Sequence, residues 1–229
     1  MYKYEMHLHS KGCSLCSIAS AKELITAAKG KGYSGVVFTN HFYRGNTCID
    51  RKLPWKDFVA AFNEDYLSAK EFGKAVDMDV LFGIEEGIGQ GKEVLIYGIS
   101  PTLLSSTPEF KSMKLPELYN FVHKNGGFAV CAHPFRRRDY ISEPDKEPEL
   151  KYFDAIEVYN HCNSVTDNLK AAEFAKKTGI PVISGGDAHN VDVIGSSGLA
   201  FNKRINDSKQ LVKELRRNSY KLIINGQIL

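Results

Sequence analysis

The sequence predicts an α/β fold, and three observations favour a closed barrel of alternating strands and helices. Short β-rich runs alternate with amphipathic helical segments along the 229 residues. Several of these runs are almost continuously apolar, which is typical of strands covered on both faces. Polar residues follow at least five of the runs at their C-terminal ends. A barrel brings every strand end around one axis, whereas an open doubly wound sheet gathers its site at one switch point.

The individual elements follow from periodicity and composition. The expected strands are Tyr2–Leu8, Val36–Thr39, Val80–Ile84, Glu93–Ile99, Phe128–Ala132, Ala155–Tyr159 and Pro181–Ser184. The expected helices are Ala19–Lys31, Trp55–Val76, Leu115–Asn125, Thr166–Thr178 and Ser208–Asn218. There is no GxGxxG or Walker sequence, which argues against a nucleotide-cofactor sheet.

Composition is that of an ordinary globular protein, with 43% hydrophobic and 25% charged residues. No Pro/Gly/Ser-rich linker divides the chain, so we expect one domain over residues 1–229. A net charge of +3 does not indicate nucleic-acid binding. The N-terminus lacks a signal-peptide apolar core, and no apolar run reaches the ~18 residues of a membrane span. These features predict a cytoplasmic protein with no membrane partner, and the odd number of cysteines, 5, favours reduced thiols.

Potential metal ligands follow five of the expected strands. His7 and His9 lie two apart at the end of the first strand and therefore point the same way. The other ligands occur in Thr39-Asn40-His41, Gly83-Ile84-Glu85, Ala132-His133-Pro134 and Gly186-Asp187-Ala188-His189. Such nitrogen and oxygen donors suit zinc, manganese or iron. A lone histidine is more often structural, but five of the seven histidines share this placement, which indicates a metal cluster.

In their order along the chain, HLHS, TNH, GIE, AHPFR and GGDAH resemble the motifs of the PHP (polymerase and histidinol phosphatase) family over about residues 4–190. The resemblance implies a distorted seven-stranded, TIM-like (β/α) barrel whose two or three divalent ions hydrolyse phosphoesters. By position, His7, His9, Glu85 and Asp187 resemble ligands of one ion. Glu85, as a bridge, and His133 would hold a second ion, and His41 and His189 a third.

Three departures from the family pattern concern these ions. Asn40 stands where the family usually has Asp, and the segment Lys11–Ser14 lacks the usual acid or histidine for the third ion. Glu93 stands where many members have a histidine, and it is a candidate ligand of the second ion that favours harder ions such as Mn²⁺ or Mg²⁺. Cys13 and Cys16 lack the second half of a structural zinc motif. Cys13, however, is a candidate substitute for the missing third-ion ligand.

The substrate is expected to be a small phosphomonoester. Arg136, within Arg136–Arg138, can bind two phosphate oxygens, and Asn160 and His161 end a strand on the expected active face. The specificity loops are expected at Tyr43–Lys56, with Trp55, and at Asp139–Lys151. In the expected mechanism the clustered ions activate a shared water, whose hydroxide attacks phosphorus, and Glu85, Asp187, His189 and Arg136 take part in catalysis.

Three alternatives remain open. A metal-dependent amidohydrolase shares the HxH opening but commonly uses a bridging lysine, and no lysine ends an expected middle strand. A TatD-like nuclease typically closes on a single Asp, without the Asp187-Ala188-His189 sequence seen here. A catalytically silent metal-binding module would fit the departure at Asn40 and the missing third-site acid. Sequence alone identifies neither the substrate nor the oligomeric state.

Overall fold

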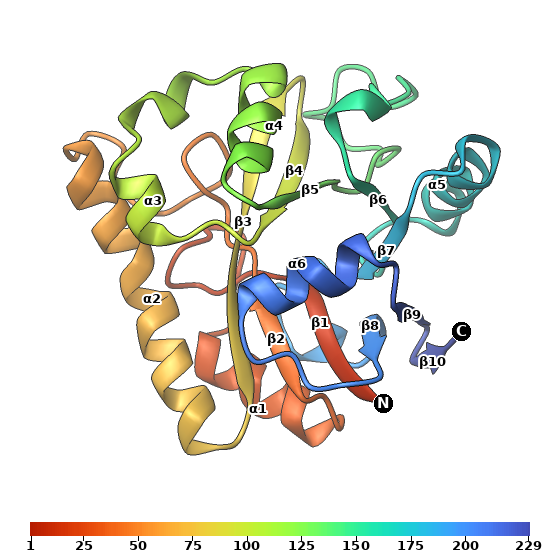
Figure 1. Ribbon diagram of the computed structural model, residues 1–229, viewed down its shortest axis with the longest axis horizontal. Coiled ribbons are helices and arrows are strands. Elements are labelled where there is room, and N and C mark those ends of the chain that lie inside the picture. The colour runs from red at the N-terminus through yellow and green to blue at the C-terminus, as the bar shows by residue number, and fades with distance from the viewer.

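The computed structural model describes residues 1–229 and contains one curled sheet of ten strands. The strand order is β10-β9-β8-β1-β2-β3-β4-β5-β6-β7. Helices lie around this sheet, which curls into a half-barrel (Figure 1). The strands are β1 Tyr2–Leu8, β2 Gly35–Phe38, β3 Asp79–Gly89, β4 Lys92–Tyr97, β5 Phe128–Cys131, β6 Ala155–Asn160, β7 Val182–Gly185, β8 Ser197–Phe201, β9 Tyr220–Ile224 and β10 Gln227–Ile228.

The α/β class is as the sequence predicts, but the expected seven-stranded barrel is not what the structure shows. β8, β9 and β10 were not expected, and they extend the sheet antiparallel from the edge of β1. β4 pairs antiparallel with both β3 and β5, so the core of the sheet is mixed rather than parallel. Apolar runs predict a strand covered on both faces but carry no information about its direction.

The segment that follows β7, at one end of the sheet, meets the interior strand β1. Leu8 of β1 forms an isolated parallel bridge with Ala188, just beyond β7. Two backbone hydrogen bonds make this contact, from His9 N–H to the Ala188 carbonyl at 2.9 Å and from Ala188 N–H to the His7 carbonyl at 3.1 Å. We call this contact the β1–β7 seam. It brings the beginning and the end of the expected ligand set together.

The five expected helices are present with ends shifted by a few residues, and a short α3 is added. They are α1 Ala21–Gly30, α2 Trp55–Ala75, α3 Pro101–Ser105, α4 Leu115–Lys124, α5 Val165–Thr178 and α6 Ser208–Arg216. Short 3₁₀ turns occur at Pro108–Ser112, Leu150–Tyr152 and Val191–Val193. Ser20 begins α1 with a reciprocal capping box to Glu23, which satisfies backbone donors that the first turn leaves unpaired. None of the helices is both long and apolar enough to cross a membrane.

The inner face of the sheet is filled by apolar side chains and covered by α6. Met6, Val37, Leu95 and Ile183 belong to a buried cluster of 17 residues that draws on strands β1 to β8. Leu211, Val212 and Leu215 of α6 complete this cluster. Helices α1 to α5 contribute to two further clusters. The polar strand ends are therefore held on a packed framework.

Candidate metal centre

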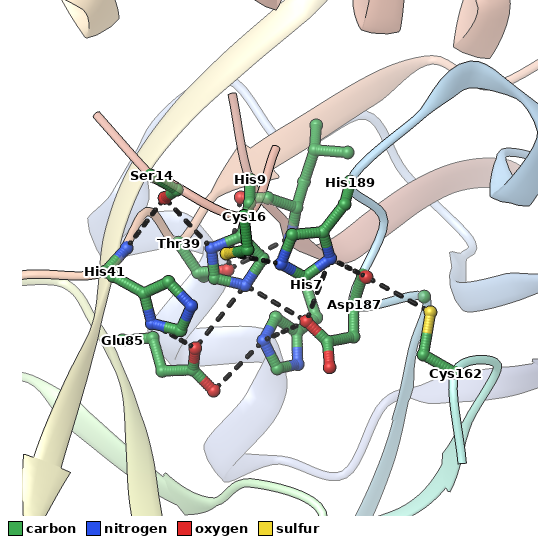
Figure 2. Close-up of polar contacts among 12 residues, drawn as sticks. His7, His9, Ser14, Cys16, Thr39, His41, Glu85, Cys162, Asp187 and His189 are labelled. Atoms are coloured by element: carbon green, nitrogen blue, oxygen red, sulfur yellow. Dashed lines mark hydrogen bonds and ion pairs between the residues drawn. The ribbon is translucent and has the colours of Figure 1, made fainter. Parts of the chain in front are cut away.

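All eight residues expected as metal ligands converge at one end of the half-barrel. His7 lies in β1, Glu85 in β3 and Glu93 in β4, while the others follow β1, β2, β5 and β7 in the chain. Figure 2 shows six of them, His7, His9, His41, Glu85, Asp187 and His189, facing one another. One expectation needs correction, because β3 does not end at Glu85 but continues to Gly89. Glu85 therefore projects from the middle of a strand, where its backbone is fixed on both sides.

Glu85 is the centre of the cluster. Its Oε1 lies 3.2 Å from His7 Nε2 and 3.0 Å from His133 Nε2. Its Oε2 lies 3.4 Å from His9 Nε2 and 3.0 Å from His41 Nδ1. A carboxylate whose two oxygens face different pairs of imidazoles has the arrangement that a bridging ligand requires.

Two further carboxylates flank Glu85. Glu93 lies 3.3 Å from His41 Nδ1 and 3.5 Å from His133 Nε2, so it reaches the same two rings as Glu85. Asp187 Oδ1 lies 3.5 Å from His7 Nε2, 3.2 Å from His9 Nε2 and 3.6 Å from His189 Nδ1. The cluster therefore has acidic oxygens on both sides of its imidazoles.

Several atoms at the centre are buried without a hydrogen-bond partner, namely His7 Nε2, His9 Nε2, His41 Nδ1 and Glu85 Oε2. Such an orphaned group costs roughly 1–3 kcal/mol, and native structures contain few of them. Ligand atoms within 4.8 Å of one another form four sets: His7, His9 and Glu85; His7, His133 and Asp187; His41, Glu85 and Glu93; and His9, His41 and His189. The donor set and its unpartnered atoms fit a cluster of divalent ions.

The local electrostatics favour the ligand forms of His9, Asp187 and Glu85, whereas the pKa values of His7 and His41 are raised, because attraction to nearby carboxylates outweighs burial. Burial, followed by repulsion from His41, lowers the pKa of His9 to about 3, which leaves its imidazole neutral. Burial raises the pKa of Asp187, but attraction to Arg136 outweighs it and holds that pKa well below its usual value. The pKa of Glu85 is likewise held low, because His7 and His41 outweigh burial. Neutral imidazoles and ionised carboxylates are the forms that bind metal.

Glu157 supports this cluster and was not expected from the sequence. It is buried on β6, and its Oε1 accepts a hydrogen bond from His7 Nδ1 at 2.9 Å. Its Oε2 accepts from the backbone N–H of His133 at 3.0 Å and from Asn160 Nδ2 at 2.9 Å. By accepting from Nδ1 it directs His7 Nε2 toward the cluster, as carboxylates commonly do for metal-binding histidines. The available signal was a glutamate inside an otherwise apolar strand.

Ser14 and Asn40 form a second support, on the side of His9 and His41. Ser14 Oγ lies 3.3 Å from His9 Nδ1 and accepts from the backbone N–H of His41 at 3.2 Å. Asn40 Oδ1 accepts from the backbone N–H of Ser10 at 2.7 Å. These two positions, which depart from the family pattern, therefore hold the loops that carry histidines.

Two of the expected ligands have unusual backbone conformations. His133 has φ 29° and Asp187 has φ 52°, both in the positive range that residues other than glycine seldom adopt. Such conformations cost about 1–3 kcal/mol each and persist where surrounding contacts hold them. Both residues lie directly after strands β5 and β7, so the chain turns sharply where the side chain enters the cluster.

The three residues expected to bind substrate differ in where the structure places them. Arg136 is buried, bonds Asp187 and Asn160 through Nη2, and donates from Nε to Asn163 at 2.7 Å. Asn160 is also buried and supports Arg136 and Glu157 rather than lining the cavity. His161 does not line the cavity, and its Nδ1 lies 3.4 Å from the Tyr159 hydroxyl, so its expected contact with the substrate stays a prediction.

The cluster opens into a cavity of about 700 Å³. Its lining includes the cations Arg44, Lys92, Arg136 and Arg138, together with His41, Glu93, Asp187 and His189. Of the expected specificity loops, Arg44, Gly45, Asn46 and Tyr140 reach this cavity. Trp55 does not, because it begins α2, donates to the Leu104 carbonyl at 2.7 Å and packs against Phe42 and Phe58. A cavity with several cations above carboxylates and imidazoles suits an anionic ligand.

The cysteines near the cluster also differ from expectation. Cys13 is fully buried and its thiol donates to the Phe62 carbonyl at 3.2 Å, so it is not a substitute ligand. Cys16 instead lies with its Sγ 3.0 Å from His189 Nε2 and lines the cavity. Burial lowers the pKa of His189, but hydrogen bonds with Cys16 and Cys162 outweigh it and raise that pKa to about 10.

The sequence is similar to known proteins over parts of its length. Residues 165–220 match the model of the PHP-associated family. An uncharacterized protein of Methanocaldococcus jannaschii is 32% identical over 98 residues, which cover 40% of this chain and 41% of that protein. The chain therefore matches less than half the length of this curated relative.

Solved structures with a similar fold are more distant in sequence. A two-domain protein of Bacteroides vulgatus, containing a predicted PHP-like metal-dependent phosphoesterase, superposes with a TM-score of 0.71 at 14% identity, over 99% of this chain and 66% of that one. An amidohydrolase of Chromobacterium violaceum with bound sulfate superposes with a TM-score of 0.53 at 16% identity, over 82% of this chain and 88% of that one. The chain is thus similar in fold to a protein with a predicted PHP-like domain, and its residues 165–220 match the PHP-associated family model.

Proposed function

We propose that this chain is a metal-dependent phosphoesterase that hydrolyses a small phosphomonoester. The observation that carries the proposal is the convergence of eight ligand side chains, with unpartnered atoms at their centre, beneath a cavity lined by four cations. The similarity to PHP-like phosphoesterases supports it.

The residues divide into a core and an outer set. His7, His9, Glu85 and Asp187 would hold one ion, and Glu85, Glu93 and His133 a second, with Glu85 shared. His41 and His189 would hold a third. Divalent ions bound there, of which zinc, manganese and iron all suit these donors, supply Lewis acidity to the phosphoryl group and to water.

The chain itself supplies orientation and charge around the substrate. Arg136 is held by Asp187, Asn160 and Asn163, so its guanidinium is fixed at the cavity wall. Arg44, Lys92 and Arg138 add positive charge to the rest of the lining, which favours a phosphate group over a neutral one. The volume of about 700 Å³ suits a small molecule.

The test compares two neighbouring buried glutamates. Glu85→Gln should abolish both metal retention and hydrolysis of p-nitrophenyl phosphate, because Glu85 faces four imidazoles. Glu86→Gln is the matched control, since Glu86 is equally buried but pairs with Arg44, and it should retain its metal. A Glu85→Gln variant with full metal content and full activity would refute the proposal.

Amide hydrolysis is the second candidate, because the amidohydrolase of Chromobacterium violaceum shares the fold. The lysine nearest the cluster does not support it. Lys92 lines the cavity, but its Nζ donates to the carbonyls of Pro134 at 2.6 Å and Pro144 at 3.3 Å. Assaying the metal-loaded protein on p-nitrophenyl phosphate, its bis ester and a p-nitroanilide separates the two activities, and metal binding without turnover would indicate a silent module.

A further inference from the structure

The outer part of the cluster contains a sulfur atom that the two-ion core does not use. Cys16 Sγ lies 3.0 Å from His189 Nε2, beside the set formed by His9, His41 and His189 (Figure 2). The rings of His41 and His189 both stack on that of His9, with centroids 4.4 Å and 4.5 Å away. Cys16, His41 and His189 therefore lie together at the cavity wall, with the buried ring of His9 stacked against both imidazoles.

Two observations independent of the cysteine indicate a ligand at this place. The first is that His41 Nδ1 is buried and lacks a hydrogen-bond partner, in a residue that is only 7% exposed. The second is that the ligand atoms of His41 and His189 come within 4.8 Å of each other, while Ser14 Oγ is engaged with His9 Nδ1 and the backbone N–H of His41. Two imidazoles are too few protein ligands for a zinc site, so a further donor is needed beside them.

The loop that carries Cys16 is fixed on both sides of it. Leu15 N–H donates to the Asn46 carbonyl at 3.0 Å. Ser17 Oγ donates to the carbonyl of His9 at 2.8 Å and to that of His189 at 3.0 Å. These bonds tie the cysteine to the two segments that carry His9 and His189. Its position beside the imidazoles therefore follows from the backbone and not only from its own contact with His189.

We infer that Cys16 is a thiolate ligand of a third ion, held together with His41 and His189, and that it makes this position selective for zinc. The inference rests on the proposed function for the presence of a metal cluster. Two imidazoles and a thiolate, completed by a water, suit tetrahedral zinc, whereas manganese prefers oxygen donors. The thiol releases its proton to solvent when the ion binds. The third ion would therefore be a different metal from the ions held by Glu85, Glu93 and Asp187.

Cobalt reports sulfur ligation directly, because a thiolate bound to Co²⁺ gives an intense charge-transfer absorption in the near ultraviolet. The chelator-stripped chain is titrated with Co²⁺, and the wild type is expected to develop this band. Cys16→Ser should lose the band and bind one ion fewer per chain, while keeping the ions of the core. Cys48→Ser is the control, since Cys48 is exposed and its thiol contacts the carbonyls of Lys11 and Gly12 rather than the cluster, and the band should persist.

Alkylation gives a second readout that needs no variant. Zn²⁺ should slow the reaction of Cys16 with iodoacetamide at least tenfold, without protecting the exposed Cys48, as peptide mass analysis can measure. A cobalt band that persists in Cys16→Ser, or unchanged alkylation of Cys16 with zinc present, would overturn the inference. Wild-type chain that binds cobalt without the band overturns the inference alone, whereas chain that binds no metal overturns the proposed function as well.

Discussion

Replacing Glu157 by glutamine tests whether the support beneath the cluster sets its metal affinity. The side chain is fully buried and accepts three hydrogen bonds, from His7 Nδ1 at one oxygen and from His133 N–H and Asn160 Nδ2 at the other. Glutamine has the same shape but only one accepting oxygen. If its amide group takes the place of Oε2, it meets two donors, and if it takes the place of Oε1, it faces His7 Nδ1.

In the second placement His7 must accept at Nδ1, which puts the ring proton on Nε2 and removes the lone pair that faces the cluster. In the first, the backbone of His133 loses its partner. Replacing such supporting residues typically weakens metal affinity about 10–100-fold, or roughly 1.4–2.8 kcal/mol. Because Glu157 supports two ligands at once, we expect a loss near 100-fold, which is about 2.8 kcal/mol.

The assay is a competition titration of zinc against a chromophoric chelator, with the thermal midpoint recorded for each variant. Asp154→Asn is the matched control, because Asp154 also joins a histidine, His123 at 2.7 Å, to a backbone N–H, that of Ala129 at 2.8 Å, but lies outside the cluster. Its zinc affinity should equal that of the wild type. A Glu157→Gln affinity within twofold of wild type, or an equal loss in Asp154→Asn, would refute the reasoning.

Four further predictions concern the cavity, the titration of the ligands, the core and a close backbone approach. Arg136→Lys should lower kcat/KM on p-nitrophenyl phosphate about 100-fold, because an ammonium cannot keep all three contacts of the guanidinium and the loss of one donor typically lowers the rate by this factor. A decrease in kcat/KM of less than threefold would contradict this prediction. Metal affinity should rise from pH 6 to pH 8, because His189 must lose a proton to bind an ion and its pKa is raised to about 10 in the metal-free chain. Equal metal affinities at pH 6 and pH 8 would be evidence against this titration. Phe42→Ala should lower the free energy of unfolding, measured in urea, by about 3–5 kcal/mol, since the fully buried Phe42 ring contacts four other aromatic rings. Leu67 is 54% exposed, so Leu67→Ala should change this free energy by under ~0.5 kcal/mol. Gly185→Ala should lower the amount of metal bound per chain, because a Cβ there would lie 2.4 Å from Glu157 Oε1 and 2.6 Å from His7 Cβ. Full metal content in this variant would show that Glu157 and His7 can shift without losing the metal.

The sequence predicted the meeting of the ligands because they follow apolar strands in regular order. His7, His9, His41, His133 and Asp187 could each be placed at a strand end without knowing the path of the sheet, since such ends gather at one edge. The direction of β4 could not be predicted in this way. An apolar run has the same composition in either direction, and only its pairing with β3 and β5 shows that it runs antiparallel.

The supporting residues were harder to predict for a different reason. Glu157 lies inside a strand, and its partners His7 and His133 are 150 and 24 residues away in the chain. The choice between Cys13 and Cys16 depended on the loop after β1. Cys13 enters the core beside Phe62, whereas Cys16, three positions later, faces His189. Spacing along the chain carries no information about such a turn.

The β1–β7 seam has a consequence for the mechanics of the fold. Only two backbone hydrogen bonds join β1 to the segment after β7 there, yet His7 and His9 lie on one side of the contact and Asp187 and His189 on the other. Ions bound by both sides would act as a cross-link between residues 180 positions apart in the chain. Amide hydrogens of His9 and Ala188 should therefore exchange with solvent far more slowly in the metal-loaded chain, which would make metal supply a determinant of how long the protein resists proteolysis.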